Sequence, residues 1–264
     1  MKKGKIKLAS WLNNNVKKNG AVIGLLVVIL VGILINGRVF LSIDNITNVG
    51  RQAALRGILA CGIALPIISG TIDLSISTLF PLCGLVCLYF SNYSFGLAIF
   101  MPLLLAAMIG TLNAVLIGKA HLHPWIVTIA MQLGLNGVNL MLTQGNTYKP
   151  ENENKLLSSF GNFSLFGLID MQLICFVLIF AVFVFLMKKK KAFRCMYAAG
   201  ASEEAATMMG IDIFKTRLLA HVLCSMLAGI AGVLLVSRSG AGQATSGNGY
   251  EMYAIAACVL GGIH

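Results

Sequence analysis

The residues best suited to chemistry are polar side chains inside apolar stretches. In the segment SGTIDLSIST, residues 69–78, the carboxylate of Asp73 lies between apolar runs at 58–68 and 79–90. The hydroxyl groups beside it belong to Thr71, Ser75 and Ser77. Hydroxyls and a carboxylate can pair free backbone groups at a helix end, so the pattern predicts an interrupted helix. Two positions stay open for this break: a turn near the inner membrane surface, or a place at or near a transport cavity.

A second polar set occurs at helical spacing within residues 125–143. Its members carry uncharged hydroxyl or amide groups: Thr128, Gln132, Asn136, Asn139 and Thr143. Their spacing puts all five on one helix face, which must turn to protein or to a watery cavity because lipid offers no hydrogen bonds. This face either holds helices together or lines a pathway for a neutral polyhydroxylated ligand such as a sugar. Further candidates for such a lining are Asn113, His221 and Ser225.

Residue types for metal, cofactor or covalent chemistry do not form a pattern. His121 and His123 are two residues apart before a proline, which is typical of a solvated loop. The seven cysteines form no CxxC pair, and neither a GxxxxGK[ST] phosphate loop nor a GxSxG elbow occurs. We therefore predict no catalytic residue, metal or cofactor, and any ATP that drives this protein must bind to another chain.

The elements that position these residues are predicted to be membrane helices. Of 264 residues, 58% are hydrophobic and 11% are charged, with a mean hydropathy of +0.85, which is too apolar for a soluble domain. We predict an all-α, polytopic transmembrane bundle of about seven to eight spans. The expected spans are 20–35, 53–69, 79–90, 95–118, 125–143, 165–187 and 218–236, with an eighth beginning near Met252.

The net charge of +11 indicates orientation and not nucleic-acid binding. Lysines without any acid occupy residues 1–19, and a second basic cluster follows the sixth span at 188–194. Basic loops stay cytoplasmic, so we expect a cytoplasmic basic N-terminus at 1–19, a single transmembrane domain at 20–264 and an outer loop at 144–164.

Glycine indicates two further features. The pairs Gly229/Gly232 and Gly134/Gly137 predict close helix packing. The run SGAGQATSGNGY, residues 239–250, is expected on the outer side, either as a flexible loop or as a docking or gating loop.

The basic loop at 188–217 contains the pattern EAAxxxG. Its residues are Glu203, Glu204, Ala205, Ala206 and Gly210. A short helix is predicted at 201–209, beginning at Ser202 or Ala201, with acids at its positive end and Gly210 as its stop. Such a helix has no lipid to bury in, so it either floats or docks on a partner.

Four ordered segments resemble the membrane permease subunits of bacterial ABC importers, in the branch that carries simple sugars such as ribose and galactose. SGTIDLSIST is similar to that branch's SGGIDLSVGS, and HPWIVTIAM at 123–131 to its Pro-aromatic-Ile-x-Thr segment. YAAGASEEAATMMGI resembles its coupling segment, and GNGYEMYAIAACVLGG at 247–262 resembles GTGYELDAIAAVVLGG.

The resemblance implies a multi-pass protein of the bacterial inner membrane that works by alternating access. Its expected partners are a separate ABC ATPase subunit, a second permease copy, an extracytoplasmic sugar-binding protein and a monosaccharide resembling ribose, galactose or xylose. Glu203, Glu204, Ala205, Ala206 and Gly210 would couple to the ATPase. The substrate pathway would involve Asp73, Asn113, Thr128, Gln132, Asn136 and Asn139.

Departures from the family pattern are also present. Thr71 and Ser77 replace glycines of the first motif, and Tyr253 stands where an Asp is usual. The family continues for some tens of residues past VLGG, so we expect its C-terminal spans to be missing here. We also expect that this form cannot transport alone, and sugar uptake by cells that carry only these 264 residues would contradict that.

Other classes of transporter remain as alternatives. The substrate of an ABC importer could instead be a nucleoside or a signalling furanose. An ion-coupled secondary carrier needs ionisable groups near the midplane, and Asp73 and Asp170 are nearly the only ones. A channel would leave the EAAxxxG segment unexplained.

Overall fold

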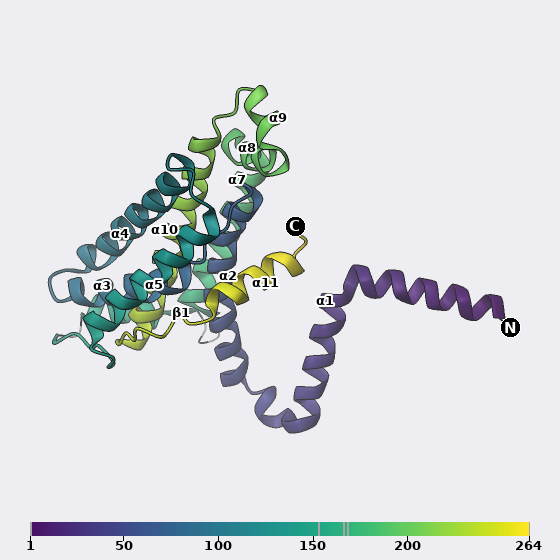
Figure 1. Ribbon diagram of the computed structural model, residues 1–264. Helices are drawn as coiled ribbons and strands as arrows, with labels where there is room; N and C mark the ends of the chain where they lie inside the picture. Colours follow the sequence, from purple (N-terminus) through teal and green to yellow (C-terminus); the bar gives the residue numbers. More distant parts are fainter. Residues whose placement is uncertain (1, 153, 166, 168, 264) are drawn as a thin grey trace. The chain divides into compact units, whose positions relative to one another are not determined.

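The computed structural model describes the backbone of residues 2–152, 154–165, 167 and 169–263, and within these ranges the side chains of residue 20 and from 22 onward. Helices dominate throughout (Figure 1), which confirms the predicted all-α class. The chain divides into two compact units, Met1–Val49 and Gly50–His264.

The first unit consists of one long helix and the beginning of the next. Helix α1 spans Lys2–Phe40, and its apolar part, Val22–Phe40, is long enough to cross a membrane. The span therefore extends five residues beyond the predicted end at Ile35. A short turn follows, and the hydroxyl of Ser42 accepts a hydrogen bond from the Asn45 backbone N–H at 3.3 Å near the start of α2.

The second unit holds the remaining elements. Its helices are α2 (Ile43–Ile68, begun in the first unit), α3 (Ile76–Ser91), α4 (Phe95–Gly118), α5 (Pro124–Thr143), α6 (Lys155–Gly161), α7 (Met171–Lys189), α8 (Lys191–Ala201), α9 (Glu203–Met208), α10 (Ile213–Ser239) and α11 (Tyr250–Leu260). Strands β1 (Ser164–Leu165) and β2 (Ile169–Asp170) pair antiparallel. In the described residues six helices have the length and apolarity to cross a membrane, and α3 and α11 are shorter apolar helices. Together they account for the seven to eight predicted segments.

Helix α10 is the centre of the second unit because small residues let its neighbours approach closely. A Cβ built on Gly232 would lie 3.1 Å from the backbone nitrogen of Gly84 in α3, and one on Gly229 would lie 3.1 Å from Cβ of Ala106 in α4. Since lipid gives no hydrophobic drive between helices, close van der Waals contact must hold them together. The predicted close helix packing is found at Gly229 and Gly232. A Cβ on Gly134 or Gly137 would meet no described atom within 4 Å.

Some predicted boundaries were wrong, among them the start of the second span, which lies at Ile43 and not at residue 53. The sixth span begins at Met171 and not at Leu165, because the paired strands β1 (Ser164–Leu165) and β2 (Ile169–Asp170) precede it. Residues 239–250 do not form a loose loop. Gly242 forms a bridge with Tyr148, with N···O distances of 2.8 and 2.9 Å, and Gly247 packs on the carbonyl of Ser77. The segment thus runs along α3, with Gly242 near Leu88 and Gly247 at Ser77. These two positions of α3 are about 16 Å apart at the rise of an α-helix.

Candidate functional site

The predicted interruption lies between α2 and α3, and backbone hydrogen bonds end α2 there. Gly70 adopts a left-handed φ of +79°. The Thr71 N–H donates to the Pro66 carbonyl at 2.9 Å, and the Gly70 N–H donates to the Ile67 carbonyl at 3.1 Å. This is a Schellman ending, which satisfies carbonyl groups that the helix leaves free. Helix α2 ends at Ile68 and α3 starts only at Ile76, so seven residues outside the helices, 69–75, lie between them.

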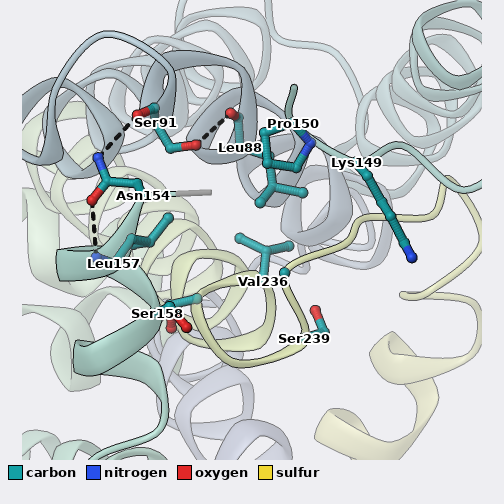
Figure 2. A pocket seen from close by; sticks show the side chains of 11 residues that line it. Leu88, Ser91, Lys149, Pro150, Asn154, Leu157, Ser158, Val236 and Ser239 are labelled. Carbon is teal, nitrogen blue, oxygen red and sulfur yellow. Dashed lines mark hydrogen bonds between the residues drawn. The ribbon is translucent and has the colours of Figure 1, made fainter. Parts of the chain in front are cut away.

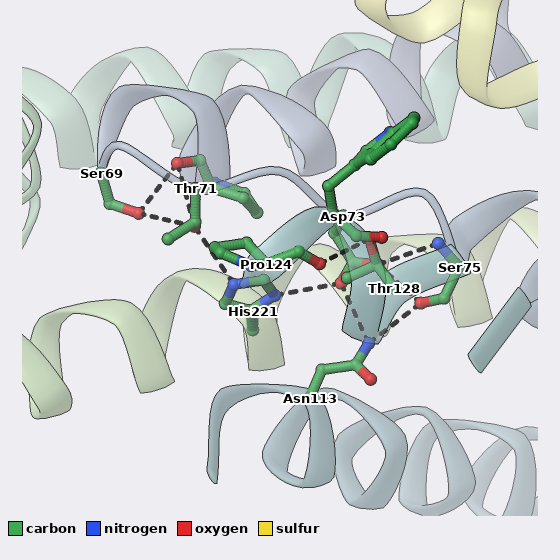
Figure 3. Close-up of polar contacts among 10 residues, drawn as sticks. Ser69, Thr71, Asp73, Ser75, Asn113, Pro124, Thr128 and His221 are labelled. Atoms are coloured by element: carbon green, nitrogen blue, oxygen red, sulfur yellow. Dashed lines mark hydrogen bonds and ion pairs between the residues drawn. The ribbon is translucent and has the colours of Figure 1, made fainter. Parts of the chain in front are cut away.

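A buried polar network fills this break (Figure 3). Oδ1 of Asp73 accepts from the backbone N–H of Ser75 at 3.0 Å and from its hydroxyl at 2.6 Å. Oδ2 lies 3.1 Å from Nδ1 of His221 and 3.4 Å from the amide nitrogen of Asn113. An ionised carboxylate only accepts, so a hydrogen bond at this contact requires the tautomer with a proton on Nδ1 of His221. Asp73, Ser75, Asn113 and His221 are all 0% exposed.

The network connects three parts of the bundle. Nε2 of His221 lies 3.1 Å from the hydroxyl of Thr71, and Asn113 donates to the hydroxyl of Ser75 at 3.0 Å. The break is therefore held to α10 and α4. Sequence reasoning expected hydroxyl groups to cap α3 and the carboxylate to help pair free backbone amides. The second expectation is met at the Ser75 N–H, whereas the Ser75 hydroxyl makes no cap and donates to Asp73. The carboxylate, not a hydroxyl, pairs the free N–H.

The position of the network along the helices follows from its members. Asn113 precedes the end of α4 by five residues, which corresponds to about 7 Å. The break therefore lies near the end of α4 that leads to α5, and not at the middle of the bundle. Both Asp73 and Asn113 were predicted to line the pathway; the structure brings them together in a closed network.

The polar face of α5 turns toward α3. Gln132 donates to the hydroxyl of Ser77 at 2.9 Å, and Asn139 donates to the Thr78 carbonyl at 2.9 Å. Thr128 and Thr143 bond to carbonyls of their own helix. Asn136 is half-buried, and its side-chain amide makes no hydrogen bond within the described chain. Two of the five residues thus hold α5 to α3, and Asn136 keeps its amide free.

Sequence reasoning missed two contacts of α11. The amide of Gln132 lies 3.4 Å from Oε1 of Glu251, whose Oε2 is buried without a hydrogen bond in the described part of the chain. The guanidinium of Arg56 in α2 lies 4.7 Å from the ring centroid of Tyr253 and 5.6 Å from that of Tyr250. Tyr253 stands where the family has an Asp, a departure that made an acidic contact at this position doubtful, and the structure has a cation–π contact there. The sequence feature that could have indicated this contact is Arg56 itself, a charged residue inside an apolar span.

The EAAxxxG segment forms α9, outside the membrane spans. The hydroxyl of Ser202 accepts from the N–H of Ala205 at 3.2 Å, which is the predicted helix start. Gly210, with φ +76°, ends the helix through a second Schellman arrangement. Glu203 forms an ion pair with Arg217 at 2.7 Å, Glu204 is exposed and Ala206 is 0% exposed. Helix α8 precedes α9 and was not predicted.

A cavity of about 290 Å³ lies beyond the other end of α3 (Figure 2). The amide of Asn154 donates to the Ser91 carbonyl at 2.9 Å, and its oxygen caps α6 at Leu157. Lys149, Ser158 and Ser239 add polar groups to its wall. In the described residues no group of three His, Cys, Asp or Glu side chains is placed to hold a metal ion.

Comparison with known proteins identifies the class. Residues 45–264 match the family described as "Branched-chain amino acid transport system / permease component". The chain belongs to this family, and it is a multi-pass protein of the inner membrane.

Several relatives come from sugar transport systems. The chain is 33% identical to Ribose import permease protein RbsC of Escherichia coli (strain K12), over 84% of this chain and 70% of the relative. It is 33% identical to the protein of the same name from Bacillus subtilis (strain 168), over 93% and 76%. It is 29% identical to L-arabinose transport system permease protein AraH of Escherichia coli (strain K12), over 85% and 68%. No solved structure matches the chain.

Proposed function

We propose that this chain forms the translocation pathway of an ATP-driven ABC importer for a monosaccharide of the ribose, galactose or xylose type. The observation that carries the proposal is the similarity over most of the chain to relatives named for ribose and arabinose. The uncharged amides of α5 agree with it, because a neutral polyhydroxylated solute needs hydrogen bonds without charge. The sugar arrives from an extracytoplasmic binding protein, and a second permease copy completes the pathway.

Within the pathway we assign sugar contact to Asn136 and Gln132. Asn136 keeps both polar atoms unpaired, and Gln132 shares its amide between Ser77 and Glu251. The carboxylate of Glu251 would add a strong acceptor for sugar hydroxyls. Thr128 and Asn139 position α5, whereas Asp73 and Asn113 support the break.

Coupling to the ATPase subunit is assigned to α9. Its exposed side includes Glu204 and Ala205, and the methionines that end it are strongly exposed, Met208 at 91% and Met209 at 68%. Exposed apolar side chains outside the lipid indicate contact with another protein. The permease itself breaks no covalent bond; hydrolysis in the partner drives alternating access.

An ion-coupled carrier is less compatible with the contacts that Asp73 and Asp170 make. Asp73 is closed in by four donor groups, and Asp170 forms an ion pair with Arg51. Neither carboxylate is open to bind a coupling ion.

The test is reconstitution. The permease, co-expressed with its candidate ATPase and binding protein, is purified and placed in liposomes with ATP inside. We expect the ATPase to co-purify and radiolabelled ribose, galactose or xylose to enter only with ATP and binding protein. Uptake driven by an ion gradient without ATP would contradict the proposal. Uptake of nucleosides but of no monosaccharide would correct the substrate.

A further inference from the structure

The end of α8 lies directly against the end of α2. A Cβ built on Gly200 would lie 3.2 Å from the backbone nitrogen of Gly70, and the carbonyl oxygen of Ile68 is closer still. In the opposite direction, a Cβ on Gly70 would lie 3.4 Å from Cα of Gly200. Any side chain at residue 200 would collide with the backbone that begins the break. Glycine is therefore required for the two segments to meet.

A second contact joins α9 to the same place. Arg217, in the first turns of α10, donates to the carboxylate of Glu203 at 2.7 Å. Its side chain is only 16% exposed, and Nη2 lies 4.0 Å from the position of a Cβ on Gly70. The guanidinium thus sits between α9 and the break. Nε of Arg217 is buried without a hydrogen bond in the described chain, whereas Nη2 forms the ion pair with Glu203.

From Gly70 inward, the contacts continue without a gap. Thr71 is the next residue and lies 3.1 Å from His221, which lies 3.1 Å from Asp73. Asn113 then connects Asp73 to α4. A continuous series of backbone contacts and hydrogen bonds therefore leads from the α9 side of the break to α4.

We propose that Gly200, Glu203 and Arg217 are positioning residues for transport, which fasten the coupling segment to the break so that motion of α9 moves residues 69–75. The inference rests on the proposed import function. The proposal assigns different roles to the adjacent residues Glu203 and Glu204. Glu203 turns to Arg217, whereas Glu204 makes no hydrogen bond or ion pair with described residues and stays available to the ATPase.

The ion pair between Glu203 and Arg217 gives the cleanest test, because the two charges can be exchanged between the two positions. Glu203 is 56% exposed, and exposed charges add little stability, so Glu203→Arg should leave the fold intact. Arg217 is only 16% exposed, so Arg217→Glu is assessed together with the double exchange, which restores an ion pair. The complete complex is compared in liposomes as wild type, Glu203→Arg, Arg217→Glu and the double exchange. Lys191→Glu is the control, since it reverses an exposed side chain of the neighbouring helix α8 that has no hydrogen bond or ion pair with described residues.

We expect each single reversal to lower the sugar imported per ATP hydrolysed about tenfold, the usual size of a coupling between sites, while hydrolysis continues. The double exchange should recover most of this ratio, and Lys191→Glu should not change it. An unchanged ratio in the single variants, or a double exchange no better than either, would overturn the proposal.

Hydrogen exchange of the purified permease tests the contact without import. Residues 69–75 should exchange faster in Glu203→Arg and in Gly200→Ala than in wild type, and at the wild-type rate in the double exchange. Gly50→Ala is the control for Gly200→Ala, because a Cβ there meets nothing within 4 Å. Unchanged exchange at 69–75 in both variants would refute the contact. Wild-type complex without ATP-driven uptake would instead refute the proposed function, and hydrogen exchange would still decide on the contact.

Discussion

Asp73 is a buried charge with a full set of partners. Four donor groups from Ser75, Asn113 and His221 surround a carboxylate that is 0% exposed. Taking a charge out of water is costly, and only such hydrogen bonding offsets the cost. The carboxylate in turn pairs backbone that neither α2 nor α3 satisfies. We therefore expect a structural role for Asp73, which holds the non-helical residues between α2 and α3.

Asp73→Asn separates the acceptor role from the charge. Asn can still accept from Ser75, but its NH2 group then faces the donors of Asn113 and His221. Breaking a buried pair on one side costs about 3–5 kcal/mol, so the thermal midpoint in detergent should fall clearly. Asp44→Asn, at an exposed position in the first turn of α2, should leave it nearly unchanged. Equal midpoints for wild type and Asp73→Asn would show that a neutral cap suffices.

At the scale of elements, the stop of α9 depends on one backbone conformation. Gly210 has φ +76°, where a β-branched side chain is strongly strained, although the space around it is open. Gly210→Val should displace the end of α9, so ATP hydrolysis continues and import falls at least about tenfold, as for a lost coupling. Gly210→Asn tolerates this conformation better and should retain more import. Normal uptake by Gly210→Val would count against α9 as the coupling helix.

The start of α10 depends on a charged cap. Asp212 accepts from the N–H of Lys215 at 2.9 Å, and this bond, with the Lys215 side chain, lowers the carboxyl pKa below its usual 3.8. A lowered pKa gives stability that is present above 3.8 and is lost as pH falls through the folded-state value. Asn still caps a helix, so Asp212→Asn removes the charge alone. Its midpoint should be lower than wild type at pH 6 and equal well below pH 3. A difference that persists in strong acid would refute this.

Element types followed from the sequence, but several ends did not. Apolar length predicted the spans, and Ser202 and Gly210 predicted the limits of α9, because these signals are local. Helix α8 was missed since its residues are mixed in polarity and its contact with α2 is made by backbone at Gly200. The partners of Asp73 were equally hidden. His221 is 148 residues away, and no spacing rule connects the two.

At the scale of the whole molecule, the expected orientation separates the two ends of the bundle. The basic segments place α8 and α9 inside and the loop at 144–154 outside. In a variant with Cys195→Ser, an impermeant maleimide should label Asn146→Cys in intact cells and Ala201→Cys only after permeabilisation. Both sites are exposed. The reverse pattern would invert the topology and exclude α9 as the contact for a cytoplasmic ATPase.

The Asp73–His221 contact also determines when the core can close during synthesis. Ribosomes add about 5–20 residues per second, so His221 follows Asp73 by roughly 7–30 s. Throughout that interval α3, with only 16 residues, has a carboxylate at its start and no α10 beside it. The nascent chain must shelter this charge in water or beside the insertion machinery. We therefore expect α3 to be seated fully in the bilayer only after α10 has been made.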